Sequence, residues 1–204
     1  MTEAIIFAGI DEVVFAKIDM AQIGIADAII EVELSAVNIP IEMSALLGKP
    51  ITGGSAFPCV PGFQAVGIVK ATGAQAALKP GERVFFTKSK LVSPFSDGNW
   101  MGAHVRYALI DASERPIEGY WTRVPDNVDV ECAIFSATPA SSAYESSPLS
   151  HEENEKVMAD LGLGNLNFVT KVSHRFKPGQ AEDVYKMILG KPSDFEGVLF
   201  DWRE

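Results

Sequence analysis

The clearest hydrophobic pattern of the chain is an alternation of apolar and polar positions between residues 27 and 36. Ala28, Ile30, Val32, Leu34 and Ala36 alternate there with Asp27, Ile29, Glu31, Glu33 and Ser35. A period of two is typical of a strand with one buried face. Apolar runs predict shorter strands at residues 4–8, 13–18, 65–72, 83–87 and 105–110, separated by turns rich in glycine and proline. Many short strands of this kind indicate a β-barrel or a β-sandwich.

Helical spacing of apolar residues is strongest in the last quarter of the chain. Apolar side chains at 181, 184, 185, 188 and 189 predict an amphipathic helix that ends at Gly190. A second helix is expected after a capping box at residues 150–153, with an apolar stripe at 157, 158 and 161. A short helix is expected over residues 40–47, following Asn38, and further strands at 168–173 and 197–201.

The composition changes at residue 136, where the strand-rich part of the chain ends. Residues 136–150 contain six serines and two prolines, which is typical of a linker or loop. We therefore predict one domain over residues 1–204, with a barrel at 1–135, a linker at 136–150, and C-terminal helices and a closing strand at 151–204. The expected fold class is α+β, mainly β with a few α-helices.

The charge of the chain restricts its partners. Its 17 lysines and arginines against 27 aspartates and glutamates give a net charge of −10, which disfavours nucleic acid and anionic membrane surfaces as partners. The two cysteines, Cys59 and Cys132, are far apart and form no CxxC pair, which fits a reducing compartment. The N-terminus lacks the pattern of a signal peptide, and no apolar run is long enough to span a membrane. We expect a cytoplasmic protein.

Six short segments resemble, in order, motifs of the medium-chain dehydrogenase/reductase family of zinc-type alcohol dehydrogenases and quinone oxidoreductases. They are VPGFQAVGIV at 60–69, KPGERV at 79–84, GAHVRY at 102–107, VPDNV at 124–128, VSHRF at 172–176 and GVLFD at 197–201. The resemblance implies the catalytic domain of that family, a GroES-like β-barrel followed by C-terminal helices and a closing strand. It also implies that the nucleotide-binding Rossmann domain, which separates the fourth and fifth motifs in the family, is missing.

Departures from the family's motifs bear on its cofactors. Asn38 stands where zinc-dependent members have a cysteine ligand, and Phe63 and Gln64 replace the histidine and glutamate of the family's GHE segment. The four clustered cysteines of the structural zinc lobe are absent from the sequence. Residues 136–165 are too few for the two βαβαβ halves of a dinucleotide fold, and Gly162 and Gly164 end a helix rather than open one. We therefore expect neither a metal nor a nucleotide cofactor.

Few residues remain as candidates for chemistry. His104 and Gln64 are weak candidates for proton transfer, and a structural role is the favoured interpretation of His104. The substitution at Phe63 makes the old substrate cleft apolar, which leaves two interpretations open: Phe63 plugs a dead site, or the cleft binds an apolar small molecule. The ligand-pocket candidates are Asn38, Phe57, Phe63, Gln64 and Trp100.

Three functions are compatible with this sequence. The leading hypothesis is a remnant of an alcohol dehydrogenase-like oxidoreductase, without metal or nucleotide, that acts as a small-molecule binding or protein-interaction module. One alternative is a cofactor-independent enzyme of the isomerase, lyase or cyclase type. The other is half of a split NAD(P)-dependent oxidoreductase. Loss of a packed domain exposes the surface that faced it, so self-association or a protein partner is expected there.

Overall fold

The structure is a computed structural model that describes residues 1–49, 57–96, 102–116, 120–136, 151–166 and 172–203. Its strands are β1 (Thr2–Gly9), β2 (Glu12–Ile18), β3 (Asp27–Val37), β4 (Gln64–Thr72), β5 (Arg83–Phe86), β6 (Tyr107–Asp111), β7 (Trp121–Arg123), β8 (His174–Phe176) and β9 (Val198–Asp201). Its helices are α1 (Ile39–Leu46), α2 (Val130–Ser136), α3 (His151–Gly162) and α4 (Ala181–Gly190), with short 3-10 turns at Pro178–Gln180 and Pro192–Asp194. The prediction of a mainly β, α+β fold with C-terminal helices and a closing strand is confirmed.

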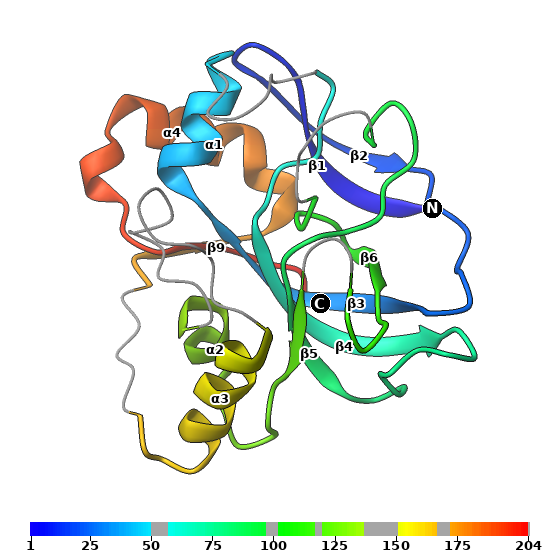
Figure 1. The fold of residues 1–204 in the computed structure, drawn as a ribbon. Coiled ribbons are helices and arrows are strands. Elements are labelled where there is room, and N and C mark those ends of the chain that lie inside the picture. Colours follow the sequence, from blue (N-terminus) through cyan, green and yellow to red (C-terminus); the bar gives the residue numbers. More distant parts are fainter. Residues whose placement is uncertain (50–56, 97–101, 117–119, 137–150, 167–171, 204) are drawn as a thin grey trace.

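Strand β3 organises the larger of two sheets. The order in that sheet is β7-β5-β4-β3-β9-β8, and β6 also pairs with β3. One edge of β3 pairs with β4, while the other pairs with β6 over residues 27–31 and with β9 over residues 34–37. Strands β1 and β2 form the smaller sheet, which bridges to Val105 and Cys59. The chain after residue 172 therefore returns to the sheet formed by its first half (Figure 1).

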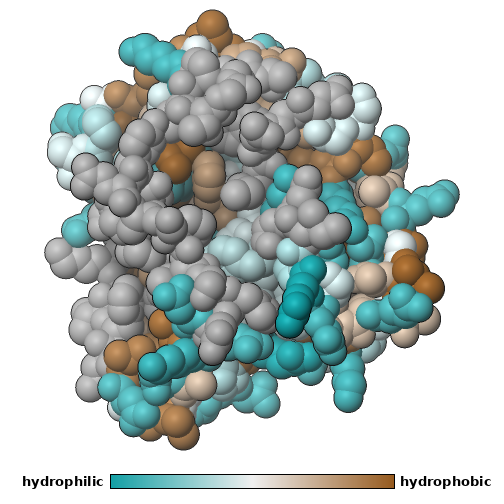
Figure 2. Space-filling model, viewed as in Figure 1, coloured by the Kyte–Doolittle hydropathy of each residue, from teal (hydrophilic) through white to brown (hydrophobic). Residues whose placement is uncertain are grey.

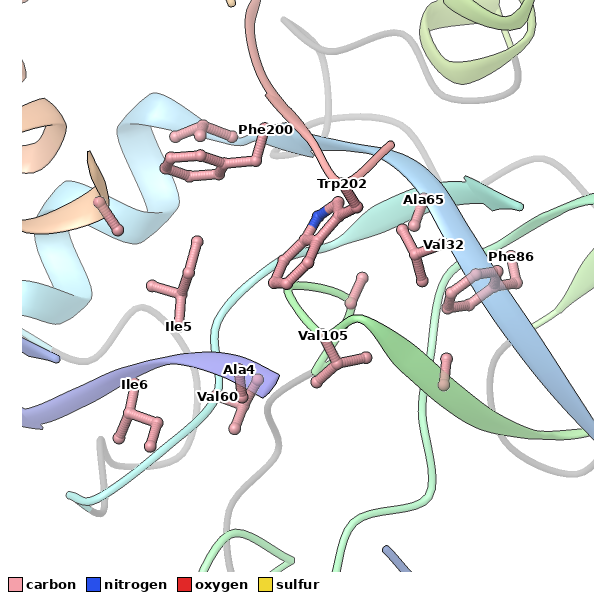
Figure 3. Close-up of a cluster of buried hydrophobic side chains, with 14 of the residues drawn as sticks. Ala4, Ile5, Ile6, Val32, Val60, Ala65, Phe86, Val105, Phe200 and Trp202 are labelled. Atoms are coloured by element: carbon pink, nitrogen blue, oxygen red, sulfur yellow. The ribbon is translucent and has the colours of Figure 1, made fainter. Parts of the chain in front are cut away.

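The main core lies between the two sheets, beneath α1 and α4. Figure 3 shows side chains from both sheets meeting around the indole ring of Trp202, which extends into the middle of the cluster. In Figure 1, α1 and α4 lie next to each other at one end of the fold, and α4 buries the apolar stripe predicted for it. Burial of this stripe is what ties the C-terminal segment to the barrel.

A second core lies on the opposite face of the large sheet. Leu34, Val66, Phe85 and Leu199 are fully buried there, and Met158 of α3 is nearly so. Helices α2 and α3 lie side by side over this face (Figure 1). The two short helices on either side of residues 137–150 thus pack on the sheet itself.

A β-bulge in β3 divides the strand between the two cores. The register with β4 shifts between Val32 and Leu34, so that Glu33 is the extra residue. Because a one-residue shift moves every later side chain to the other face, Leu34 joins the second core and Ser35 points into the main core. The prediction of one alternation from 27 to 36 with a single buried face is wrong beyond Val32 for this reason.

The remaining differences from the expected elements are local. Helix α2 and strand β7 were not expected, and the expected strand at 105–110 begins at Tyr107. Of the strand expected at 168–173, residues 168–171 lie outside the described residues, while Val172 and Ser173 belong to no strand and β8 begins one residue later. Residue 136 ends α2, and the rest of the predicted linker, 137–150, lies outside the described residues. In the part of the chain that the structure describes, we find no helix whose length and hydropathy suit a membrane span.

Ion pairs join β3 to β4 and, across β4, to β5 at the surface of the large sheet. Lys70 lies 2.9 Å from Glu31, and Arg83 lies 2.8 Å from Glu33. Figure 2 shows hydrophilic side chains gathered over the lower part of the visible face, where β4 and β5 lie in Figure 1. Surface pairs of this kind each add little stability, and their acidic members contribute to the negative charge of the chain.

Candidate functional site

Asn38 and Glu42 cap the first turn of α1 reciprocally. The backbone N–H of Ile41 donates to Oδ1 of Asn38 at 3.3 Å, and the backbone N–H of Asn38 donates to Oε1 of Glu42 at 2.9 Å. Asparagine is a favoured N-cap because its side-chain oxygen satisfies an N–H that has no partner within the helix. The side-chain oxygen of Asn38 is therefore engaged in ending β3 and starting α1.

Four of the five predicted pocket residues lie in the described part of the chain. Gln64 opens β4 and pairs with Ala36, so that Gln64 and Asn38 stand at adjacent strand ends. Phe63 precedes Gln64 and is half-buried, and Phe57, also half-buried, packs against the main core. We refer to Asn38, Phe63 and Gln64 together as the strand-end face. The fifth predicted residue, Trp100, lies outside the described residues.

His104 lies in the interior and not at the surface. The residue has no exposed area, and both of its ring nitrogens have polar neighbours. Nδ1 lies 2.7 Å from Oγ of Ser35, and Nε2 lies 3.2 Å from Oε2 of Glu42. This placement agrees with the structural interpretation of His104, and it separates the ring from direct contact with a substrate.

Two residues of the C-terminal segment complete a buried polar chain. The hydroxyl of Tyr185, on α4, donates to Oε2 of Glu42 at 2.5 Å, and Nε1 of Trp202 donates to Oγ of Ser35 at 2.9 Å. The chain thus runs Trp202–Ser35–His104–Glu42–Tyr185, and all five residues are buried. We call these five residues the buried polar chain.

The electrostatic surroundings of Glu42 are those of a low-dielectric interior. Burial raises the pKa of Tyr185 well above its ordinary value, and the neighbouring charge of Glu42 raises it further. Burial likewise raises the pKa of the Cys59 thiol to about 12, again with a contribution from Glu42. Both groups therefore stay protonated at neutral pH, and Tyr185 remains a hydrogen-bond donor.

Gly62 connects the buried polar chain to the strand-end face. Its φ of +100° lies in the region that favours glycine. A Cβ at this position would lie 2.6 Å from the backbone nitrogen of His104 and 2.8 Å from Cγ of its ring. Because no side chain fits between them, the backbone just before Phe63 lies directly against the imidazole.

The prediction that no metal binds concerns the metal-ligating atoms at the positions that resemble zinc ligands. Among the described residues, no three His, Cys, Asp or Glu side chains are grouped so that they could hold a metal ion. Of the positions that resemble zinc ligands, Asn38 uses its oxygen in the helix cap and Phe63 has no donor atom. A zinc ion therefore does not fit these residues.

The sequence interpretation missed most of the buried polar chain. Ser35, Glu42, Tyr185 and Trp202 were not expected to meet, and only His104 was singled out. Two signals were available: Glu42 is the one charged residue in the apolar run from 39 to 47, and Ser35 lies between apolar neighbours. Neither signal indicates which residue is the hydrogen-bond partner, because partners such as Ser35 and Trp202 are 167 residues apart.

Comparisons with known proteins agree with the fold. Residues 24–114 match the profile of the alcohol dehydrogenase GroES-like domain. Over 169 residues the chain is 24% identical to the 2-desacetyl-2-hydroxyethyl bacteriochlorophyllide A dehydrogenase of Cereibacter sphaeroides, a match that covers 81% of this chain and 51% of that protein. The chain thus spans about half the length of this curated relative.

Solved structures with a similar fold include two oxidoreductases. The alcohol dehydrogenase TADH from Thermus sp. ATN1 aligns with a TM-score of 0.71 and 15% identity, over 98% of this chain and 100% of that chain. The quinone oxidoreductase from Coxiella burnetii aligns with a TM-score of 0.66 and 10% identity, over 99% of each chain. At these identities the likeness is one of fold.

Proposed function

Because residues 24–114 form an alcohol dehydrogenase GroES-like domain, we propose that this chain is a metal-free and nucleotide-free member of the oxidoreductase-like fold that binds an apolar small molecule at the strand-end face. The observation that carries the proposal is the composition of that face. Phe63 is partly exposed and directly precedes Gln64, and the amide residues Gln64 and Asn38 stand at adjacent strand ends. Binding sites for small molecules are mostly apolar, with a few polar groups that fix orientation.

The absence of a metal is supported by the chemistry of the same residues. A phenylalanine ring and an amide already used as a helix cap cannot replace the thiolate and imidazole ligands that a catalytic zinc requires. Removing a metal site in this way lowers the polarity of the face. An uncharged, apolar ligand suits such a face better than an anionic one, since the chain itself carries a net charge of −10.

The absence of a nucleotide site is supported by the two helices that follow β7. Only the fourteen residues 137–150 separate α2 from α3, and both helices pack on the large sheet. A single βαβ unit needs roughly 30 residues or more, so this interval cannot hold a dinucleotide fold. We therefore expect neither NADH nor NADPH to raise the melting temperature of this chain, and a shift that grows with nucleotide concentration would contradict the proposal.

The proposal can be tested with N-phenyl-1-naphthylamine, a neutral apolar dye that fluoresces when it enters an apolar site. Titration of the folded protein should show saturable binding, and Phe63→Ala should weaken it while the protein stays folded. Phe135→Ala, at a partly buried phenylalanine of α2 that packs against the second core, is the matched control and should leave the affinity unchanged. Equal affinity in the Phe63→Ala variant, or no saturable binding at all, would contradict the proposed site.

A second candidate is favoured by one observation. This candidate is half of a split oxidoreductase. The match to the Cereibacter dehydrogenase covers only 51% of that protein, which is the share expected if another chain supplied a nucleotide domain.

Self-association at the former interdomain face can be tested separately. Light scattering behind a sizing column would reveal a homo-oligomer, and a stable monomer would count against the expected self-association at this face. Nothing in the geometry favours a cofactor-independent isomerase, lyase or cyclase, since His104 is enclosed.

A further inference from the structure

The buried polar chain can be satisfied by one arrangement of protons. Nε1 of Trp202 can only donate, so Oγ of Ser35 accepts from it. The Ser35 hydroxyl is then able to give its own hydrogen to Nδ1 of His104. In the same arrangement His104 carries a proton on Nε2 and donates to Oε2 of Glu42, which also accepts from Tyr185. Each bond in this series fixes the direction of the next, so the five side chains act as one unit.

One end of this unit reaches the strand-end face at two points. The carboxylate of Glu42 accepts the backbone N–H of Asn38, which positions the start of α1. The ring of His104 lies against Gly62, and the backbone N–H groups of Ala103 and His104 donate to the carbonyls of Gly62 and Pro61. A movement of Glu42 or His104 therefore moves both Asn38 and the backbone that leads into Phe63.

The other end belongs to the C-terminal segment. Tyr185 stands on α4 with its ring edge against Phe7, at a centroid distance of 5.0 Å. Trp202 follows β9 and fills the main core (Figure 3). Both residues reach the barrel through a donated hydrogen bond as well as through apolar packing.

We infer that the buried polar chain couples the attachment of α4 and β9 to the geometry of the strand-end face, with Tyr185 and Trp202 as positioning residues for the ligand proposed above. The ligand in this inference rests on the proposed function, whereas the coupling between the C-terminal segment and the strand-end face does not. Tyr185 acts through Glu42, and Trp202 acts through Ser35. Binding at the face then stabilises the docked C-terminal segment, and the docked segment favours binding.

The test uses Tyr185→Phe, which removes only the hydroxyl donor, and Trp202→Phe, which removes the N–H donor together with part of the indole ring. Trp121→Phe and Tyr120→Phe are matched controls, because Trp121 donates to the carbonyl of Ser113 and Tyr120 bonds to Asn154, away from the buried polar chain. The first measurement is hydrogen exchange at the backbone amides of Asn38, Ala103 and His104. We expect exchange at these amides to rise about fivefold or more in the two test variants and to stay unchanged in the controls.

The second measurement is the affinity for N-phenyl-1-naphthylamine in the same four variants. Coupling predicts an affinity at least about fivefold weaker in the two test variants, and less-than-additive loss when both are combined, because they break one chain. A merely structural role would lower the melting temperature of test and control variants alike and leave the affinity unchanged. If either test variant fails to fold, Ser35→Ala breaks the same chain at its middle and takes its place.

The two proposals fail in different ways. Unchanged exchange at Asn38, Ala103 and His104 in the test variants would overturn the coupling, whatever the dye does. Dye binding that is absent in the parent protein, combined with faster exchange in the test variants, would overturn the proposed ligand and leave the coupling in place.

Discussion

The two faces of the large sheet are stabilised in different ways. On the side of α2 and α3, aliphatic and aromatic side chains fill the second core. On the other side, the main core encloses five hydrogen-bonded polar side chains within a larger set of apolar ones. Apolar cores tolerate exchange of one hydrophobic residue for another, whereas a buried polar network is stable only when every member has its partner. We therefore expect the second core to accept substitution and the polar side of the main core to resist it.

The largest effect is expected for Gly62→Ala. The new Cβ meets the backbone and ring of His104 at a positive φ, so we expect a loss of about 4 kcal/mol in the free energy of unfolding. Gly81→Ala is the control, because Gly81 has a similar φ of +93° but no atom within 4 Å of the added Cβ, and we expect it to cost about 1 kcal/mol. Urea denaturation measures both, and equal losses would mean that contact with His104 is unimportant.

The next largest effect is expected for Glu42→Gln. The amide lacks the charge and one acceptor that Tyr185, His104 and the backbone of Asn38 share, so we expect a loss of about 3 kcal/mol in the free energy of unfolding. The same substitution at Glu33, which pairs with Arg83 near the surface, should cost less than about 1 kcal/mol. A Glu42→Gln protein as stable as the parent would show that the polar side of the main core does not resist substitution more than the second core does.

A substitution on the other face tests the role of α3. Met158 is buried against the second core, so we expect Met158→Ala to cost about 2 kcal/mol, mainly through lost burial. Met187→Ala, at a methionine of α4 that is 45% exposed, should change stability by less than about 0.5 kcal/mol. If Met158→Ala is as neutral as the control, α3 contributes nothing to the second core. Met158→Leu should restore most of the stability, as expected for an apolar core.

The last comparison concerns reactivity and not stability, at the two cysteines Cys59 and Cys132. Burial raises the pKa of Cys59 to about 12, and Glu42 adds to the shift, so its thiolate is scarce at pH 8. With a pKa about three units above that of a free thiol, Cys59 should be alkylated by iodoacetamide about a thousandfold more slowly than a free thiol. Burial also raises the pKa of Cys132, but this residue is only partly buried, so we expect it to be the faster site of the two. Glu42→Gln should lower the pKa of Cys59 and raise its rate by a small factor. Mass spectrometry of timed samples distinguishes the two sites.

Elements set by local periodicity could be predicted from the sequence. Helix α4 and the first half of β3 follow the apolar spacing closely, because a helix or strand with one buried face needs that spacing. The bulge at Glu33 could not be predicted, since it depends on pairing with β4 some thirty residues later. Helix α2 was missed because its seven residues are too few for a periodic pattern to stand out.

The candidate site was predictable only in part. The resemblance grouped Asn38, Phe63 and Gln64 as pocket candidates, and the structure puts Asn38 and Gln64 at neighbouring strand ends. The resemblance could not show that Asn38 caps a helix. The partners of His104 lie 69 and 62 residues away in Ser35 and Glu42, and no local pattern records such distances. Tyr185 looked like one more apolar residue of an amphipathic helix, since spacing shows which side is buried and not what its hydroxyl meets.

The position of β9 has a consequence for how the protein is made. Strand β9 inserts between β3 and β8, and Trp202, just beyond it, bonds to a serine 167 residues earlier. While the chain is being synthesised, residues 34–37 of β3 lack their pairing with β9 until residues 198–201 have left the ribosome. An open strand edge can pair with another chain, and contacts of such long separation form slowly. Nascent chains of this protein therefore depend on the edge of β3 staying protected until β9 has been translated.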